Sequence, residues 1–261
     1  MSASQIRRHE KMRSRILRNE RDILVYLPPG YDDQPERHFP VLYMQDGQNL
    51  FDPNTSFIKD MYWRVGETAD ALIGAAAIQP LIIVGIYNLG KRRAGEYTPV
   101  KMPRLGGGRA EKYTKMLLQE LKPWVESKYR VQSGAAHTGM AGSSLGGLYT
   151  LYAGLRFPNV FGKLAALSPS VWWGRGWMND FAAKAPMDSR PRIWLDVGTR
   201  ESARIVPTVE RFRDVLYSRG WRLGGDLHFE IIEGGEHNED AWAKRVGPFL
   251  QFLFPARETA I

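Results

Sequence analysis

Residues 138–147 read Thr-Gly-Met-Ala-Gly-Ser-Ser-Leu-Gly-Gly, and they decide how this chain is expected to fold. The stretch has the spacing G-x-S-x-G around Ser144, after a predicted strand and before a predicted helix. This context is typical of a sharp turn that presents a serine hydroxyl at its apex, where larger side chains would obstruct the backbone. The pattern also fits a glycine-rich turn with incidental serines, and Ser143 offers a competing hydroxyl off the apex.

Short apolar runs lie on both sides of this turn and alternate with segments of helical period. Most of these runs lack polar alternation, as expected for strands that helices cover on both faces. The chain is therefore predicted to be an α/β protein with a mostly parallel central sheet of about eight strands. The predicted strands cover residues 22–27, 41–44, 81–87, 138–142, 164–167, 193–197 and 227–232.

The predicted helices follow the serine turn or separate the strands. Apolar spacing predicts helices over 113–125, 149–155 and 205–216, and a last helix over about 240–254 that ends before Pro255. Two irregular stretches, 88–108 and 171–191, follow strands at the carboxyl edge of the sheet and are expected to be lids or binding surface. No repeat or linker divides the chain, so residues 1–261 are expected to form a single domain.

The composition excludes several classes of protein. The chain has 36 Lys and Arg against 28 Asp and Glu, a formal charge of +8, and no cysteine, which excludes disulfides and a cysteine nucleophile. No stretch approaches the roughly 18 apolar residues of a membrane span, and no basic, aromatic-interleaved module indicates a nucleic-acid partner. Because residues 1–21 lack the apolar core of a signal peptide, a cytoplasmic location is predicted.

A serine nucleophile needs a base, which in a fold with this turn follows the last strand. Three of the five histidines precede the serine in the chain, and His228 lies within a predicted strand. His237 remains, in a glycine-containing loop directly after the strand predicted over 227–232. A loop histidine is by itself more often plain surface, but together with the serine turn it is predicted to be the base.

The acid that orients the imidazole is expected between the serine and the histidine. Residues 193–201 contain two carboxylates, Asp196 within a predicted strand and Glu201 beyond its end. Glu201 is favoured because the acid must reach the histidine from the loop after the strand. The alternatives are that Asp196 is the acid, or that Glu201 only stabilises the start of the following helix.

Two backbone N–H groups are expected to stabilise an oxyanion. Leu145 follows the serine at the start of a helix, so its N–H is free to donate. The second donor is expected from the loop after the strand over 41–44, where Gly47 permits close backbone approach. The Gln48 N–H is the candidate, with Asp46 and Gly47 lining the substrate pocket. An ordinary tight turn, in which Asp46 only satisfies local backbone groups, is the alternative.

With these residues the chain resembles an esterase family of the α/β-hydrolase superfamily. That family includes esterase D-like enzymes, siderophore trilactone esterases, feruloyl and acetylxylan esterases, and mycolyltransferases. The resemblance implies an α/β-hydrolase fold, the triad Ser144, Glu201 and His237, and an oxyanion donor directly after Asp46 and Gly47. The shared motifs are specific for the family and not for the substrate, and they cover residues 25–31, 46–51, 96–99, 142–147, 167–170, 198–201 and 234–237.

The expected activity is hydrolysis of a small or medium-sized ester, without a metal or an organic cofactor. Arg92, on a basic segment at the serine edge of the sheet, is a candidate to attract an anionic ester, although solvated surface charge is the simpler explanation and the one the sequence favours. Tyr97, from a shared motif, and Trp172 and Trp173 are expected to contact the substrate, with core packing as the alternative for one tryptophan. An acyltransferase with the same triad is the rival function, and a non-catalytic binding module is a weaker one.

Overall fold

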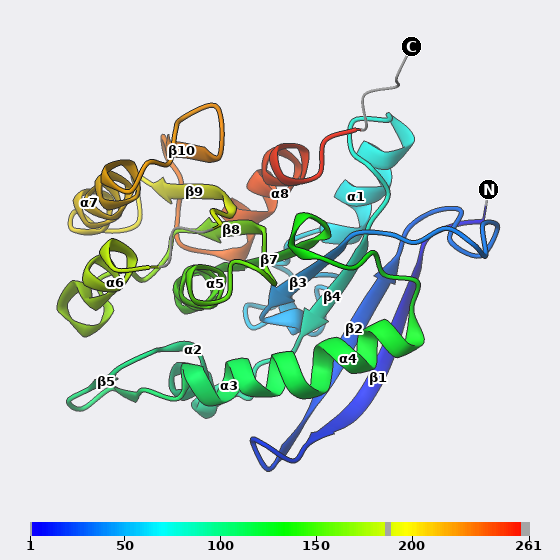
Figure 1. The fold of residues 1–261 in the computed structure, drawn as a ribbon, viewed down its shortest axis with the longest axis horizontal. Coiled ribbons are helices and arrows are strands. Elements are labelled where there is room, and N and C mark those ends of the chain that lie inside the picture. Colours follow the sequence, from blue (N-terminus) through cyan, green and yellow to red (C-terminus); the bar gives the residue numbers. More distant parts are fainter. Residues whose placement is uncertain (1, 186–188, 257–261) are drawn as a thin grey trace.

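The computed structural model describes residues 2–185 and 189–256. Within them, one eight-stranded sheet has the strand order β1-β2-β4-β3-β7-β8-β9-β10 (Figure 1). β2 pairs antiparallel with β1 and β4, and all the other neighbours are parallel, so the mostly parallel α/β fold is confirmed. The strands are β1 (Gln5–Ser14), β2 (Asn19–Leu27), β3 (Val41–Gln45), β4 (Ile82–Ile86), β7 (Thr138–Ser143), β8 (Lys163–Leu167), β9 (Arg192–Gly198) and β10 (Leu227–Ile232).

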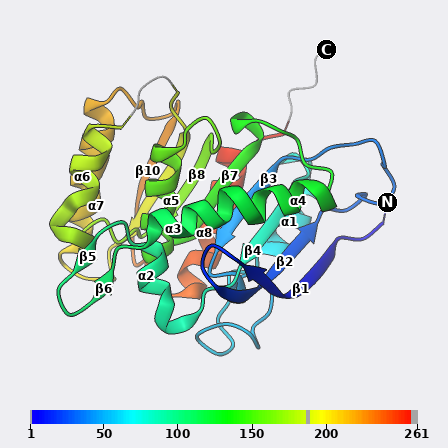
Figure 2. The ribbon, with the colours of Figure 1, turned by 60° about the horizontal axis from the view of Figure 1, so that its bottom comes forward.

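Helices cover both faces of this sheet (Figures 1 and 2). On one face, α1 (Val65–Gly74) and α8 (Glu239–Leu253) enclose one buried apolar cluster. On the other face a second cluster lies beneath the remaining long helices. These are α3 (Ala110–Met116), η3 (Leu117–Leu121), α4 (Lys122–Lys128), α5 (Leu145–Arg156), α6 (Trp173–Ala183) and α7 (Ile205–Ser218). Both faces of the central parallel strands are therefore dry, which explains their continuous apolar sequences, whereas β10 at the edge of the sheet is partly exposed.

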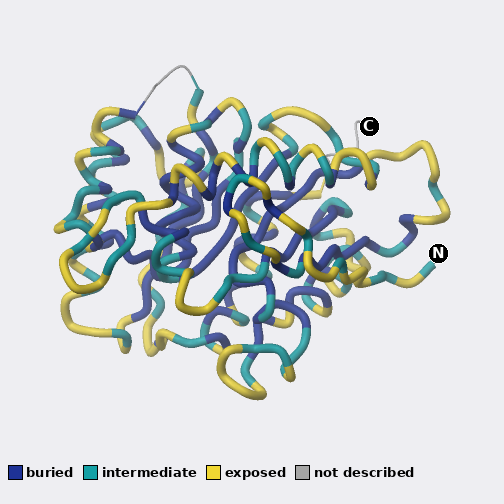
Figure 3. The backbone as a smooth tube through the Cα atoms, turned by 90° about the horizontal axis from the view of Figure 1, so that it is seen from below, coloured by how far each residue is buried: buried dark blue, intermediate teal, exposed yellow. Residues whose placement is uncertain are grey.

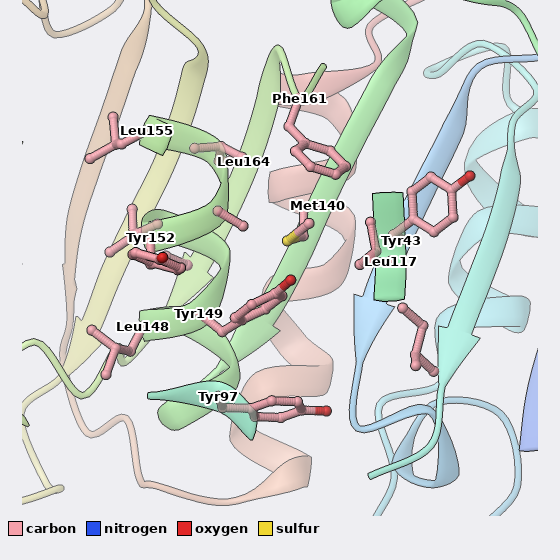
Figure 4. Close-up of a cluster of buried hydrophobic side chains, with 14 of the residues drawn as sticks. Tyr43, Tyr97, Leu117, Met140, Leu148, Tyr149, Tyr152, Leu155, Phe161 and Leu164 are labelled. Carbon is pink, nitrogen blue, oxygen red and sulfur yellow. The ribbon is translucent and has the colours of Figure 1, made fainter. Parts of the chain in front are cut away.

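The centre of the sheet and α5 are almost entirely buried, and Figure 3 shows buried backbone, in dark blue, running through the middle of the molecule. Every residue of β3, β4 and β7 is buried. Figure 4 shows the side chains between α5 and the sheet, where Tyr149 from α5 lies between Met140 of β7 and Tyr97. This packing gives the serine turn, which joins β7 to α5, a rigid base.

β1 is the strand that the sequence did not predict. It lies at the edge of the sheet, and its exposed residues are mostly charged or polar. Its register with β2 shifts between His9 and Met12, and Lys11 has a positive φ of 53°. Charged residues and a bulge are common on edge strands, where they discourage pairing with other chains, so no apolar alternation marked this strand.

The two stretches expected to be irregular contain short elements. Residues 88–108 include η2 (Gly90–Arg92), α2 (Arg93–Tyr97) and the two-stranded sheet of β5 (Lys101–Met102) and β6 (Gly106–Gly107). The stretch 171–191 contains α6, and its residues 186–188 lie outside the described ones. In the described part of the chain, no helix is long and apolar enough to cross a membrane.

The parallel strands bring four loops to one edge of the sheet. β3 is followed by η1 (Gly47–Asn49), β7 by Ser144, β9 by the segment containing Glu201, and β10 by the segment containing His237. Because these strands run in the same direction, their carboxyl ends meet, and residues far apart in the chain become neighbours.

Candidate active site

The serine turn has a strained backbone. Ser144 has φ 56° and ψ −122°, outside the regions that non-glycine residues favour. A Cβ at Gly142 would lie 2.7 Å from the carbonyl carbon of Gly146, so no side chain fits there. Hydrogen bonds hold the turn on both sides: the Ser144 N–H donates to the Leu167 carbonyl at 3.0 Å, and the Ser144 carbonyl accepts from the Ser170 N–H at 3.0 Å. The strain exposes the hydroxyl, as the glycine spacing predicts.

His237 lies between β10 and α8 and reaches the serine. Its Nε2 is 3.0 Å from Ser144 Oγ, and the edge of its ring meets Trp242 with centroids 4.9 Å apart. The next residue, Asn238, caps α8, since its side chain accepts a hydrogen bond from the Ala241 N–H at 2.9 Å. The cap and the Trp242 contact hold the loop in place beside the helix start.

Glu201 lies on the other side of the imidazole. Its Oε2 is 2.8 Å from His237 Nδ1, and its Oε1 accepts hydrogen bonds from the Gly198 N–H, at 2.7 Å, and from the Ser168 hydroxyl. Burial by itself raises the pKa of Glu201, but these hydrogen bonds outweigh burial and hold the pKa below its ordinary value. The carboxylate is therefore ionised and fixed in one orientation.

Asp196, the alternative acid, lies away from the imidazole. Its side chain is fully buried and accepts from Arg245 Nη1 at 2.7 Å, from Trp194 Nε1 at 2.7 Å and from the Ser168 N–H at 3.2 Å. Burial raises the pKa of its carboxyl against the opposing effect of Arg245. The structure thus brings Glu201 to His237, while Asp196 forms a buried ion pair behind it.

The predicted oxyanion donors lie at the starts of two helical turns. Leu145 is the first residue of α5, where the N–H groups have no acceptor within the helix. In η1, Asn49 donates to the Asp46 carbonyl at 2.9 Å and Leu50 donates to the Gly47 carbonyl at 3.4 Å, so the turn does not use the Gln48 N–H. A Cβ at Gly47 would lie 2.5 Å from the Gly85 carbonyl carbon, which makes glycine necessary there.

A cavity of about 300 Å³ opens beside Ser144 and His237. Phe57, Ile58 and Trp242 contribute apolar side chains to its lining. Its polar lining residues include Asp46, Asn49, Arg93 and Glu239. The mixture suits a ligand with an apolar body and a few polar groups.

Five residues expected at the substrate are not among the described residues that line the cavity, and Gly47 is one of them. Tyr97 is fully buried, and its hydroxyl accepts a hydrogen bond from the Asp46 N–H at 3.2 Å. Trp173 is buried and donates from Nε1 to the Val100 carbonyl at 2.7 Å. Trp172 is 39% exposed and Arg92 is exposed, and neither is among the described residues that line the cavity. Tyr97 and Trp173 are aromatic residues of the core, so burial removes them from any substrate.

Several residues of the site were not singled out by sequence reasoning. Ser168 binds Glu201, Trp242 packs on His237, and Phe57 lines the cavity. The motif at 167–170 was the one available signal for Ser168, and nothing in the local pattern marked Phe57. Within residues 2–185 and 189–256, no group of three or more His, Asp or Glu side chains is placed to hold a metal ion.

The model of the family described as "Putative esterase" matches residues 14–249. The chain belongs to this family. The esterase is 30% identical over 254 residues to the uncharacterized protein YjcH of Bacillus subtilis, covering 93% of this chain and 95% of that protein. It is 27% identical over 243 residues to an iron(III) salmochelin esterase of Escherichia coli, covering 87% of this chain and 52% of that enzyme. This esterase therefore spans about half the length of the second relative.

The fold of this esterase is also that of solved esterases. The enterobactin esterase of Shigella flexneri, solved in the presence of enterobactin, superposes with a TM-score of 0.76 at 24% identity, covering 97% of this chain and 60% of that one. At that identity the likeness shows the shared α/β-hydrolase fold. From the family match and the named relatives we conclude that this esterase is a serine ester hydrolase.

Proposed function

We propose that Ser144, His237 and Glu201 form the catalytic triad with which this esterase hydrolyses a small or medium-sized carboxylic ester. The observation that carries the proposal is one continuous hydrogen-bonded chain. Ser144 Oγ lies 3.0 Å from His237 Nε2, and His237 Nδ1 lies 2.8 Å from Glu201 Oε2. Both distances are within the range over which a base takes up a hydroxyl proton and an acid orients the base.

The reaction begins when Ser144 Oγ attacks the ester carbonyl carbon and His237 Nε2 accepts the hydroxyl proton. The carbonyl oxygen becomes an oxyanion, which the N–H groups of Leu145 and Gln48 stabilise. Collapse of this intermediate breaks the bond to the alcohol, which leaves with the proton from His237 and leaves an acyl group on Ser144. Water, deprotonated by His237, then attacks the acyl carbon, the bond to Ser144 Oγ breaks, and His237 returns the proton to Ser144 as the acid leaves. Glu201 keeps the imidazole in the tautomer that these steps need.

The substrate is proposed to be a small-molecule ester with an apolar acyl or alcohol part. The apolar side of the cavity, formed by Phe57, Ile58 and Trp242, supports this class. The relatives named for iron(III) salmochelin and enterobactin favour siderophore-derived esters as the first group to test. Arg92 is exposed at the end of η2, whose Gly90 lines the cavity, and from there it would attract an anionic ester.

An ester panel tests the function. It contains short p-nitrophenyl esters, feruloyl sugars and catecholate trilactones, each assayed with wild type and with Ser144→Ala. Wild type is expected to release acid and alcohol in equal amounts, and Ser144→Ala to be slower by about 10⁶ in kcat. Acyl transfer to an added alcohol in preference to water would identify an acyltransferase instead, and activity retained by the variant would overturn the role of Ser144.

A further inference from the structure

Residues of the segment 88–97 form hydrogen bonds to the side chain of Asp46, two residues before the proposed oxyanion donor Gln48. Arg93 Nε donates to Asp46 Oδ1 at 2.8 Å, and Arg93 Nη2 donates to Oδ2 at 2.7 Å. Asn88 Nδ2 donates to Oδ1 as well, at 2.7 Å. A carboxylate that binds a planar guanidinium through both oxygens has little freedom to rotate, because the two bonds fix its direction as well as its distance.

The same segment also holds the turn itself. The hydroxyl of Tyr97 accepts from the Asp46 N–H at 3.2 Å, and the Asn88 N–H donates to Gln48 Oε1 at 3.2 Å. Asp46 has a left-handed backbone with φ 57° and ψ 48°. Such a conformation persists in an ordinary residue only where the surroundings determine it from several sides. Both the side chain and the backbone N–H of Asp46 are thus restrained by residues 88–97.

The restraint is anchored in the core. Tyr97 is fully buried and packs against Tyr113 and Tyr149, with ring centroids 5.4 and 5.7 Å away, and Figure 4 shows it beneath Tyr149. The Arg93 guanidinium lies 5.3 Å from the centre of the Tyr97 ring. Burial alone lowers the pKa of Arg93, yet Asp46 raises it above its ordinary value, so the guanidinium stays charged. The contacts that restrain Asp46 therefore come from side chains that are themselves packed against the core.

Arg93 also lines the cavity, so direct binding of an anionic substrate is the rival role. The hydrogen bonds argue against it, since Nε and Nη2 both point to Asp46. The Asp46 carboxylate in turn neutralises the guanidinium at 2.7 Å. A paired cation attracts an anion much less than a free one does.

We propose that Arg93 is a positioning residue for ester hydrolysis: by holding Asp46, it keeps the Gln48 N–H where the oxyanion forms. The inference rests on the proposed function, in which Gln48 supplies one of the two oxyanion donors. A displacement of a catalytic group by about 1 Å can cost about 100-fold in rate. Loss of the Arg93–Asp46 hydrogen bonds is therefore expected to weaken stabilisation of the transition state more than binding of the substrate.

The test compares Arg93→Gln with Lys91→Gln, which removes a charge from an exposed position of the same segment. Both are assayed on a neutral p-nitrophenyl ester, with active sites counted by labelling with a fluorophosphonate. Arg93→Gln is expected to lower kcat about 10- to 100-fold and to change KM less than about threefold. The affinity for a trifluoromethyl ketone, which forms an oxyanion on the serine, should fall in parallel. Lys91→Gln should match wild type.

Two further variants keep the proposal testable if Arg93→Gln folds poorly. Tyr97→Phe removes the hydroxyl that holds the Asp46 N–H and keeps the buried ring, and it should lower kcat about 3- to 10-fold at constant KM. Adding Asp46→Asn to Arg93→Gln removes the unpaired carboxylate, so the double variant should fold better than Arg93→Gln, while its kcat per labelled site stays low because Asp46 is no longer held by Arg93.

The outcomes separate this inference from the proposed function. A raised KM with unchanged kcat in Arg93→Gln would make Arg93 a substrate-binding residue. Unchanged kcat per labelled site in Arg93→Gln and Tyr97→Phe would show that the hydrogen bonds to Asp46 have no part in catalysis. Either result overturns the inference about Arg93. If Ser144→Ala is inactive in the same assays, the assignment of the triad still stands. Activity retained by Ser144→Ala would instead remove the proposed function itself.

Discussion

The Ser168 hydroxyl donates a hydrogen bond to Glu201 Oε1, the oxygen opposite the one that faces His237. Ser168 Oγ itself accepts from Trp242 Nε1 at 3.2 Å and from Arg245 Nη1 at 2.9 Å. Because these two donors occupy the acceptor sites of the hydroxyl, its proton is directed to Glu201. A serine outside the triad therefore connects the Arg245–Asp196 ion pair to the proposed acid.

Ser168→Ala is expected to weaken both stability and turnover. The variant leaves the Trp242 N–H without its acceptor, which should cost about 1–3 kcal/mol of unfolding free energy. It also frees Glu201 to rotate, so kcat should fall about tenfold with little change in KM. Urea unfolding and steady-state kinetics measure the two effects. An unchanged kcat would mean that the Gly198 N–H and His237 orient Glu201 without the serine.

Glu201→Gln and Asp196→Asn are expected to fail in different ways. Glu201→Gln should lower kcat about 10⁴-fold, because the imidazole is then held in the wrong tautomer. Asp196→Asn removes the nearer counter-ion of the buried Arg245 and leaves only the Glu201 carboxylate at 3.9 Å, so it should cost about 3–5 kcal/mol of stability with a much smaller loss of rate per folded site. Kinetics normalised by active-site labelling, together with thermal unfolding, separates the variants. The reverse pattern would assign the triad acid to Asp196.

Stability should depend on pH through Glu201. The folded state holds the pKa of Glu201 below its ordinary value of 4.5, so the folded state binds fewer protons there than the unfolded chain does. Its contribution to the unfolding free energy is then complete above pH 4.5 and is lost as the pH falls through the folded-state pKa. The stability difference between wild type and Glu201→Gln should therefore shrink as the pH falls below 4.5. Urea unfolding of both proteins checks this, and a constant difference would contradict it.

Gly47→Ala is expected to disturb the oxyanion turn. The new Cβ would lie 2.5 Å from the Gly85 carbonyl carbon, and backbone atoms of a central strand cannot move aside cheaply. A loss of about 1–3 kcal/mol in stability and of at least tenfold in kcat should follow. Gly74→Ala is the matched control, since nothing lies within 4 Å of its Cβ position at the end of α1. It should be neutral or stabilising by up to about 1 kcal/mol.

Arg92→Gln tests whether an exposed charge two residues beyond the cavity-lining Gly90 selects the substrate. If Arg92 attracts anionic esters, kcat/KM for an anionic ester should fall about 3- to 10-fold at low salt, while a neutral ester of equal size is unaffected. Screening should remove the difference at about 1 M salt. Equal effects on both esters would show that Arg92 is ordinary surface charge.

The sequence predicted those features whose residues are all neighbours in the chain. The glycines around Ser144 are demanded by the turn itself, so the serine could be recognised from its neighbours in the chain. The seven predicted strands were placed within a few residues, and in the central ones burial on both faces leaves a continuous apolar run, whereas β10 is partly exposed. β1 was missed because an edge strand is free to be charged, and its pairing with β2 does not need an apolar pattern.

The sequence favoured Glu201 over Asp196 as the acid, but only the tertiary structure shows which side chains from different strands are in contact. The chain order Ser144, Glu201, His237 limited the candidates, but two carboxylates five residues apart, Asp196 and Glu201, differ only in which side of a strand end they occupy. Likewise Arg92 and Arg93 are neighbours in the sequence, yet Arg92 is exposed whereas Arg93 forms an ion pair with Asp46. Periodicity reports which face of an element is buried, whereas such contacts depend on where separate strand ends meet in space.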